Sequence, residues 1–312
     1  MKKIEDLRSA IEVLKTVPGQ YQETYVPAEP HAEISGIYRY VGAGGTVKRP
    51  TKTGPALLFH NVKGHEDAKV LIGLLASRER VALLLQDRPE HLGFLLKEAV
   101  QNPIPPVLTD SGDAPCHQVV HYAWEEGFDI RRLIPAPTNT PEDAGPYITM
   151  GMCYASDVET KESDITIHRL CLQDKDLISM YFVPGARHLG AFREKAEALG
   201  KPLPISISIG VDPAIEIASC FEPPTTPMGY NELGVAGAIR KEGVKLTDCL
   251  TIEEKCIANA EYVIEGELLP NTYVREDQNT NTGKAMPEFP GYTGAANPKV
   301  PLIKVKAVTH RK

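Results

Sequence analysis

The segment DITIHRLCL, residues 164–172, decides the fold that we expect for this chain. Apolar residues in this segment stand together or alternate with polar residues. Its isoleucines and threonine are β-branched, and such residues favour strands. The same pattern recurs in five further segments: ISMYFV (178–183), PISISIG (204–210), AIEIAS (214–219), YVIEGELL (262–269) and VPLIKVKAV (300–308). Many short strands with few helices predict a barrel-like sheet, which makes the overall class α/β or α+β.

The chain before this segment has a different pattern. Residues 4–17 carry apolar side chains at helical spacing, residues 55–61 indicate a buried strand, and residues 66–86 and 90–101 indicate helices. This combination predicts a small α/β domain.

The segment LIPAPTNTPEDAGP, residues 133–146, separates the two patterns. Its four prolines exclude a regular helix or a central strand. We therefore place an N-terminal α/β domain at 1–132 and a barrel domain at 133–312. Two helices are expected within the barrel domain, at 190–200 and at 251–261, where Thr251 and Glu254 have capping-box spacing.

Composition excludes several classes of protein. The net charge of −7 argues against nucleic acid or an anionic membrane as the main partner. The six cysteines form no CxxC pair, and Cys153, Cys171 and Cys220 lie in apolar runs, which indicates reduced, buried thiols. We find no signal peptide and no apolar run as long as a membrane span, and we expect a cytoplasmic protein.

Arg169 lies near the end of the predicted strand and allows two interpretations. An arginine in a strand is most often half of a surface ion pair. The alternative is a clamp for a carboxylate or a phosphate, because the planar guanidinium offers paired donors.

Asp164, His188 and Glu232 can together ligate a divalent ion such as Mn²⁺ or Mg²⁺, because two carboxylates and an imidazole suit such ions. Their spacing does not show that they meet. In an ideal strand Asp164 and Arg169 also point to opposite faces. Both serve one site only if the strand is bulged or bent, or if they bind different parts of one ligand.

Glu276 and Glu288 flank a loop rich in glycine and proline, and a solvated loop is the plain interpretation. If Met286, Phe289 and Pro290 shield Glu288 from water, its protonated form is favoured and it can deliver a proton near neutral pH. Glu276 is expected to stay ionised.

Two further segments suggest contacts to a cofactor. Thr225 and Thr226 lie in a proline-rich turn that leads into a helix, and they can offer hydroxyl and N–H groups to a phosphate or flavin edge; helix capping is the alternative. The segment GAGGT (42–46) fits neither nucleotide-binding glycine motif, and we interpret it as a turn.

Seven long motifs are spread along nearly the whole chain: VGAGGTVKRPT (41–51), APTNTPEDAGPYIT (136–149), SDITIHRL (163–170), GARHLGAF (185–192), FEPPTTPMGYNELGVAGAIR (221–240), AMPEFPGYTG (285–294) and ANPKVPLIKVKAVTHR (296–311). Together and in this order they resemble the hydroxyarene branch of the UbiD family, which includes gallate and protocatechuate decarboxylases. The fold implied for the second domain is a split β-barrel that binds a flavin.

The resemblance also implies cofactors and residue roles. The cofactors are prenylated FMN, made by a partner flavin prenyltransferase, with Mn²⁺ or Mg²⁺ and a K⁺ ion. The metal ligands fall on Asp164, His188 and Glu232, although many members have asparagine at the first position. The catalytic trio falls on Arg169, Glu288 and, across an insertion, Glu276. Contacts to the flavin fall on Thr149, Ile167, Arg169, Arg187, His188, Thr225, Thr226 and Pro227.

The implied reaction is the non-oxidative decarboxylation of a hydroxybenzoate such as gallate or protocatechuate, which high CO₂ can reverse. Loss of CO₂ from an aromatic acid leaves an unstable carbanion, and covalent catalysis by the modified flavin avoids it. Family members continue beyond the position of Lys312 into a domain that builds homo-oligomers, and we expect that domain to be absent here. Two other functions remain open: a catalytically silent flavin-binding or assembly module, and a flavin oxidoreductase on a split barrel.

Overall fold

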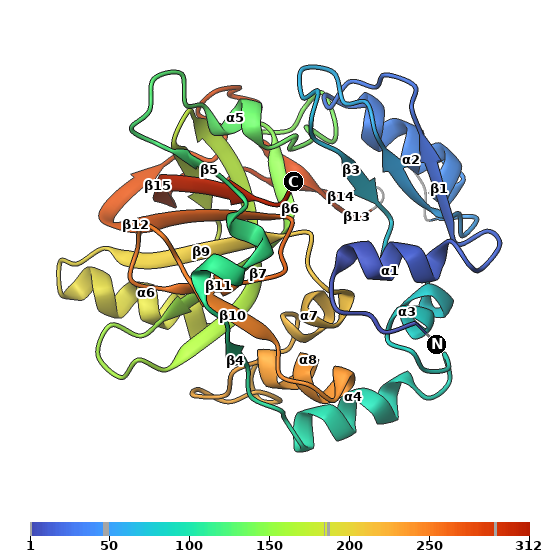
Figure 1. Cartoon of the computed structure of the whole chain (residues 1–312). Helices are drawn as coiled ribbons and strands as arrows, with labels where there is room; N and C mark the ends of the chain where they lie inside the picture. Colours follow the sequence, from blue (N-terminus) through green and yellow to red (C-terminus); the bar gives the residue numbers. More distant parts are fainter. Residues whose placement is uncertain (1, 46–49, 184, 186–187, 290–291) are drawn as a thin grey trace.

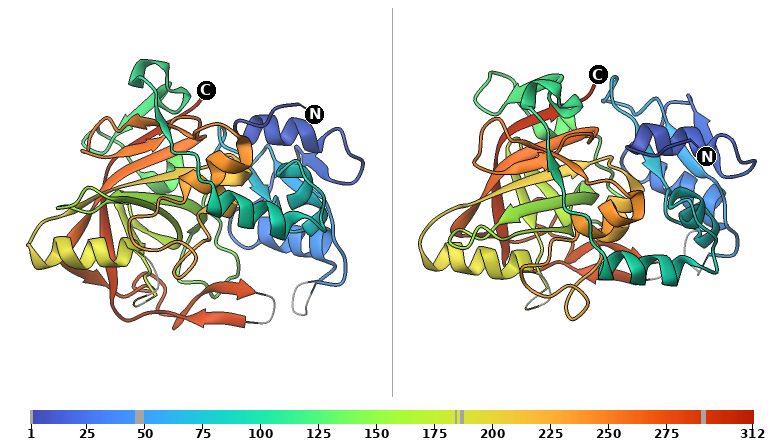
Figure 2. Two further views of the ribbon diagram at one scale, coloured as in Figure 1. Left: turned by 90° about the horizontal axis from the view of Figure 1, so that it is seen from below. Right: turned by 60° about the horizontal axis from the view of Figure 1, so that its bottom comes forward.

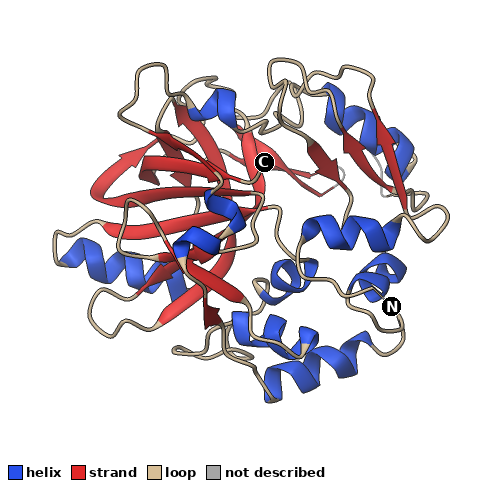
Figure 3. Cartoon of the chain, viewed as in Figure 1, coloured by secondary structure: helices blue, strands red, loops and turns tan. Residues whose placement is uncertain are grey.

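The computed structural model of the chain describes residues 2–45, 50–183, 185, 188–289 and 292–312. Figures 1 and 3 show a large strand-rich body beside a smaller part with mixed helices and strands. The mixed class and the barrel expected from the sequence are therefore confirmed.

The large body is a closed antiparallel barrel of six strands in the order β12, β9, β6, β7, β8 and β15, and a pairing between β12 and β15 closes it. A seventh strand, β5, extends the sheet from β15. The bounds are β5 Val119–Tyr122, β6 Tyr147–Ser156, β7 Ser163–Asp174, β8 Leu177–Met180, β9 Leu203–Ile209, β12 Tyr262–Val274 and β15 Val300–His310. Because β15 pairs with β12, β8 and β5, the final apolar strand is buried within the sheet.

The strands of the barrel divide their side chains between two hydrophobic clusters, as alternation requires. On β7, Leu170 and Leu172 pack in one cluster with Leu189 and Phe192 of α6 (His188–Ala198). Ile165 packs in the other cluster, against α4 (Leu92–Gln101), α7 (Pro213–Ala218) and α8 (Leu233–Arg240). Strand β7 is therefore covered on both faces, and its polar side chains are held at fixed positions.

The smaller part contains a three-stranded sheet of β1 (Tyr21–Thr24), β2 (Ala56–Phe59) and β3 (Val70–Ile72), with β1 and β2 parallel. Its helices are α1 (Leu7–Leu14), α2 (Glu33–Ala43) and α3 (Arg78–Leu84). The single helix predicted at 66–86 is wrong. The run Val70–Ile72 pairs with β2 instead, Gly73 then takes a positive φ of 78°, and the helix begins only after Ser77, whose side chain caps it.

The remaining elements are short strands and helices outside the barrel and the three-stranded sheet. They are β4 (Val107–Leu108), η1 (Ser111–Asp113), η2 (Pro115–His117), α5 (Ile130–Leu133), β10 (Lys245–Asp248), β11 (Lys255–Ile257), β13 (Lys284–Phe289) and β14 (Tyr292–Ala295). Strands β4 and β5 precede the boundary predicted at 132–133, yet both pair with strands that follow it. That boundary stays a prediction. Figure 2 shows the β13–β14 hairpin projecting from the barrel.

Two predicted elements of the second half are corrected. AIEIAS (214–219) lies largely in helix α7, because Asp212 caps the helix and Pro213 occupies its first turn. The helix predicted at 251–261 is absent among these described residues, and part of the segment forms β11. The Thr251 hydroxyl does not cap a helix but donates to the buried carboxylate of Glu265.

Candidate active site

Arg169 on β7 brings together the two glutamates that the sequence suggests. Its Nε and Nη2 each donate to one oxygen of Glu276 at 2.8 Å, and its Nη1 donates to Glu288 Oε1 at 2.8 Å. Glu276 follows the end of β12, and Glu288 lies on β13. The barrel and the projecting hairpin therefore contribute to one acid–arginine–acid cluster.

The carboxylate of Glu276 is fully occupied by donors. Besides Arg169, it accepts from the Tyr147 hydroxyl at 3.0 Å and from the Asn297 backbone N–H at 2.9 Å. Its side chain is only 2% exposed. Burial, with the charge of Glu276 nearby, raises the pKa of Tyr147, which keeps that hydroxyl a donor. Glu276 is consequently a fixed anchor for the guanidinium.

Glu288 differs from Glu276 in its exposure. The Glu288 side chain is 44% exposed, so the described residues leave much of it open to solvent. The side chain of Phe289, and Pro290, lie outside the described residues. A Cβ at Gly294 would meet Glu288 Oε1 at 2.9 Å and Arg169 Nη1 at 3.3 Å, so the absence of a side chain there makes room for the pair.

Sequence reasoning missed three supports of the cluster: Tyr147, Tyr181 and the backbone of Asn297. The Tyr181 ring lies 4.0 Å from the Arg169 guanidinium, and its backbone N–H donates to the Arg169 carbonyl. Tyr147 on β6 is paired with Cys171 on β7, two residues from Arg169. Both tyrosines are neighbours of Arg169 across the sheet, so only the strand register could have identified them.

Asp164, His188 and Glu232 do meet, at the other end of β7. One ligand atom from each lies within 4.8 Å of the other two, and all three side chains are buried. His188 Nδ1 is 3.6 Å from Asp164 Oδ1. His188 is the first residue of α6, and Glu232 is the N-cap of α8.

The pKa values of the two carboxyl groups in this cluster are set by burial and by the contacts among its three members. Burial, and then the hydrogen bond and charge of Asp164, raise the pKa of Glu232 to about 9. Burial also opposes the charge on Asp164, but hydrogen bonds with His188 and Glu232 outweigh burial and hold its pKa below the usual range. His188 Nε2 and Glu232 Oε2 have no hydrogen-bond partner among the described residues. Two carboxylates and an imidazole with unpartnered buried atoms fit a divalent ion.

The two clusters use opposite faces of β7. Residues Asp164 to His168 pair one for one with β6, so β7 has no bulge in this stretch. The register shift falls on β6, between Ile148 and Gly151. Five residues of strand separate Asp164 from Arg169, or about 16 Å. Of the arrangements that the sequence allows, a bulge in β7 between Asp164 and His168 is therefore excluded.

The other predicted contact residues that the structure describes differ in their exposure. Thr149 is exposed and lies in the β6 bulge, Ile167 is half-buried on β7, and Thr226 is buried between exposed Thr225 and Pro227. Arg187 lies outside the described residues. In GAGGT (42–46), Gly44 ends α2 with a φ of 80°, and Thr46 lies outside the described residues.

The cysteines are mostly buried, as predicted, but not uniformly. Cys116, Cys153, Cys171 and Cys256 are buried, whereas Cys220 is exposed. The prediction for Cys220 is wrong because the chain turns outward after α7. No described helix is long and apolar enough to cross a membrane.

Known proteins resemble this chain along most of its length. It is 57% identical over 307 residues to the gallate decarboxylase of Lactiplantibacillus plantarum, and the match covers 98% of this chain and 63% of that protein. The apo structure of 3,4-dihydroxybenzoic acid decarboxylases from Enterobacter cloacae superposes with a TM-score of 0.94 at 57% identity, covering 99% of this chain and 63% of that one. This chain thus spans about 63% of the length of these relatives.

A more distant relative carries a flavin. An evolved dimeric form of the UbiD-class enzyme HmfF from Pelotomaculum thermopropionicum, in complex with prFMN, superposes with a TM-score of 0.86 at 32% identity. That match covers 99% of this chain and 66% of HmfF.

Family domains account for both parts of the fold. Residues 14–99 match the N-terminal domain of 3-octaprenyl-4-hydroxybenzoate carboxy-lyase. Residues 107–312, which include every strand of the barrel, match the Rift-related domain of the same carboxy-lyase. This chain therefore belongs to the UbiD family.

Proposed function

We propose that this chain is the N-terminal and flavin-binding part of a non-oxidative decarboxylase that acts on gallate or protocatechuate. The observation that carries the proposal is the Arg169–Glu276–Glu288 cluster, in which a guanidinium is fixed by one carboxylate and touches a second, more exposed one. Identity of 57% to a gallate decarboxylase supports the substrate class. High CO₂ is expected to reverse the reaction.

Prenylated FMN is the cofactor that we propose, with Mn²⁺ or Mg²⁺ and K⁺ at its phosphate. Asp164, His188 and Glu232 would hold the divalent ion. Thr149, Ile167 and the Thr225–Pro227 turn would contact the flavin, together with Arg187. When bound, this cofactor supplies an electrophilic ring system that takes up the electron pair left by departing CO₂.

Arg169 is suited to orient the substrate carboxylate. Among the described residues, partners occupy three of its five N–H donors, one each on Nε, Nη1 and Nη2. The N–H groups left on Nη1 and Nη2 can pair with a carboxylate in a bidentate manner. Tyr181 against the guanidinium face and Glu276 at its side keep the guanidinium from turning away.

Glu288 is the proton donor that we propose for the ring carbon. It makes one described hydrogen bond, to Arg169, whereas Glu276 is bound on both oxygens. Its exposed carboxyl can take a proton from solvent and pass it on without breaking a buried network.

Glu288→Gln should lower kcat by about 100- to 10,000-fold, the range typical of general acid catalysis, and change KM little. The amide keeps the size of the side chain but cannot give up a proton. Steady-state release of CO₂ measures the effect, and Glu98→Gln on the exposed face of α4 is the control. Full turnover by Glu288→Gln would exclude this role.

Gly294→Ala should reduce kcat about 10- to 100-fold with little change in melting temperature, since small displacements at a site are costly to rate. The added methyl group would displace the Glu288 carboxylate from Arg169. Gly93→Ala in α4 adds a methyl group with nothing within 4 Å and should leave kcat unchanged. Equal kinetics for the two variants would show that the close approach at Gly294 is unimportant.

The proposal as a whole is tested on the chain produced together with a flavin prenyltransferase and purified without oxygen. Mass spectrometry identifies the released cofactor, and formation of pyrogallol from gallate or catechol from protocatechuate reports turnover. Prenylated FMN with turnover supports the function. Prenylated FMN without turnover, with activity restored by adding the remaining part of a full-length relative, favours a silent binding module. A flavin that cycles with NAD(P)H favours an oxidoreductase.

We further propose a cytoplasmic location and a homo-oligomeric full-length form. The flavin prenyltransferase would be its cofactor supplier. Neither nucleic acid nor a membrane is proposed as a partner, in keeping with the net charge of −7.

A further inference from the structure

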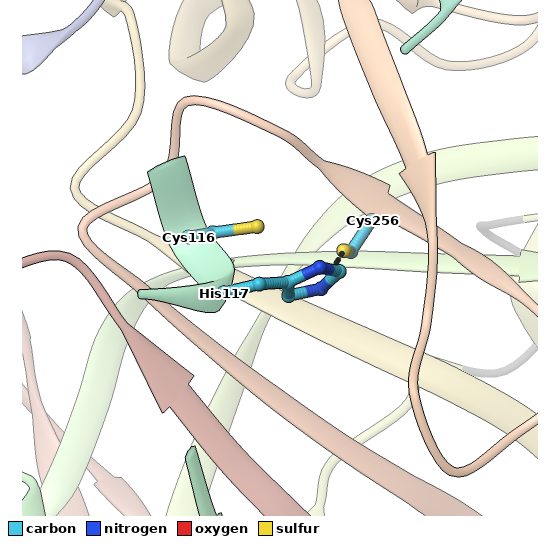
Figure 4. A group of neighbouring side chains, drawn as sticks. All are labelled: Cys116, His117 and Cys256. Carbon is cyan, nitrogen blue, oxygen red and sulfur yellow. Dashed lines mark hydrogen bonds between the residues drawn. The ribbon is translucent and has the colours of Figure 1, made fainter. Parts of the chain in front are cut away.

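Cys116, His117 and Cys256 converge at a point that the proposed reaction does not use. Cys116 and His117 belong to η2, and Cys256 belongs to β11. Their ligand atoms lie within 4.8 Å of one another, and the Nε2 atom of His117 is 3.9 Å from the sulfur of Cys256. Figure 4 shows the imidazole nitrogen facing this sulfur, with the Cys116 side chain extending above the same ring.

The spacing is close to that of a tetrahedral site for a soft metal. With Zn–S of about 2.3 Å and Zn–N of about 2.0–2.1 Å, ligand atoms around zinc lie about 3.5–3.8 Å apart. The observed 3.9 Å between nitrogen and sulfur needs almost no adjustment. The other ligand atoms also lie within 4.8 Å of one another, so small side-chain rotations would suffice to bring all three to a common ion.

The hydrogen bonds of His117 to Ser111 use Nδ1, so Nε2, which faces the Cys256 sulfur, can bind a metal. Its Nδ1 lies 3.0 Å from the Ser111 hydroxyl and 3.3 Å from the Ser111 carbonyl. Donation from Nδ1 to that carbonyl places the proton on Nδ1 and directs the Nε2 lone pair toward the sulfurs. A hydrogen bond of this kind is the usual support of a metal-bound histidine.

The surroundings enclose both cysteines in a buried hydrophobic cluster. Both sulfurs belong to residues with no exposed surface, while His117 is half-buried and gives a path from solvent. Cys249 directly follows β10, whose Thr247 is paired with Cys256 of β11. Buried Glu265 anchors the loop after Cys249 by accepting from Leu250 N, Thr251 N and the Thr251 hydroxyl.

We propose that Cys116, His117 and Cys256 form a structural site for a thiophilic divalent cation such as Zn²⁺, with water as the fourth ligand. Two thiolates neutralise the ion, which makes its burial favourable. The site ties η2 to β11 through His117 and Cys256, which are 139 residues apart in sequence. It is independent of the Asp164–His188–Glu232 cluster, which offers no sulfur.

Co²⁺ titration of the reduced, metal-free chain tests the proposal, because thiolate ligation gives a sulfur-to-metal charge-transfer band that a carboxylate site cannot give. We expect the band to saturate at about one Co²⁺ per chain and to disappear on addition of Zn²⁺. Cys116→Ser and Cys256→Ser should abolish the band, and His117→Gln should weaken Co²⁺ binding at least about 10- to 100-fold. Cys220→Ser, an exposed cysteine outside the cluster, should change neither.

A second experiment uses the wild-type chain, so it still tests the proposal if a serine variant fails to fold. It measures how far Zn²⁺ protects the cysteines from alkylation. Zn²⁺ should slow alkylation of Cys116 and Cys256, read by peptide mass spectrometry, while Cys220 reacts at the same rate with and without the ion. Absence of a charge-transfer band in the wild-type chain would overturn the proposal. So would alkylation that Zn²⁺ does not slow, or a Cys116–Cys256 disulfide that forms in place of metal binding.

Discussion

Arg169→Met should abolish decarboxylation, by about 1,000-fold or more, and should destabilise the chain by about 3–5 kcal/mol. The two losses have separate causes. Turnover fails because the substrate carboxylate loses its paired donors. Stability falls because Glu276, 2% exposed, is left as a buried charge without its cation.

A double variant separates these causes. Arg169→Met with Glu276→Gln removes both charges but keeps an amide whose oxygen can accept from the Asn297 N–H and whose NH2 group can donate to the Tyr147 hydroxyl. Replacing both members of a buried ion pair is often neutral, whereas removing one is costly. We therefore expect most of the lost stability to return in urea unfolding, while turnover stays absent.

Arg240 provides a matched control in the same chain. It forms a buried pair with Asp212, in which the side chains are 10% and 6% exposed, and it lies outside both clusters. Arg240→Met should destabilise the chain by a comparable amount yet leave kcat of the folded fraction unchanged. If Arg169→Met retained turnover while Arg240→Met lost it, the role proposed for Arg169 would be wrong.

The sequence could predict the barrel strands and the members of the two candidate clusters, because both depend on local sequence patterns. The Ile- and Val-rich alternation of β7, β9, β12 and β15 specifies strands whichever neighbours they find. The motifs around Arg169, Asp164 and Glu288 identify their residues singly. The sequence pattern does not predict how the strands pair. The pairing register of β7 with its neighbours brings Tyr147 and Tyr181 to the Arg169 guanidinium.

The wrong elements show where tertiary contacts override local preference. Residues 251–261 carry a capping box and helical spacing, but the buried carboxylate of Glu265 takes the N–H groups and hydroxyl that would begin that helix. AIEIAS alternates like a strand, yet Asp212 and Pro213 start a helix in front of it. In both cases hydrogen bonds to a carboxylate, that of Glu265 or that of Asp212, stabilise a backbone conformation that the local pattern does not predict.

The Cys116–His117–Cys256 cluster escapes sequence analysis for a related reason. Adjacent Cys116 and His117 lack the spacing of familiar zinc motifs, and Cys256 is distant in the chain. They meet because η2 is anchored to the end of β11, where the Cys116 N–H donates to the Ala258 carbonyl at 3.0 Å.

Glu232→Gln should make the metal-free chain more stable than the wild type at pH 8, and should remove much of the pH dependence of stability. Folding raises the pKa of Glu232 from the ordinary glutamate value of 4.5 to about 9. Between these values the folded chain holds a proton that the unfolded chain has released. The free energy of unfolding therefore falls as pH rises through this window, by about 3–6 kcal/mol for this group.

A divalent ion should reverse the effect in the wild type, because it replaces the shared proton with a stronger positive charge. At 100 times its dissociation constant, Mn²⁺ should raise the free energy of unfolding by about 2.7 kcal/mol. Glu232→Gln should lose most of this gain, since a neutral amide is a weaker ligand. Urea unfolding at several pH values, with and without Mn²⁺, measures both effects.

Glu216→Gln is the matched control for Glu232→Gln, because it removes a buried glutamate that lies outside the proposed cation site. Glu216 is buried on α7, and burial together with the charge of Asp212 raises its pKa to about 8. Glu216→Gln should therefore also flatten the pH dependence, but it should keep the full response to Mn²⁺. Loss of the Mn²⁺ response in Glu216→Gln, or its survival in Glu232→Gln, would place the ion elsewhere. The pattern expected here, with pH sensitivity at both glutamates and metal sensitivity at one, would identify the Asp164–His188–Glu232 cluster as the cation site.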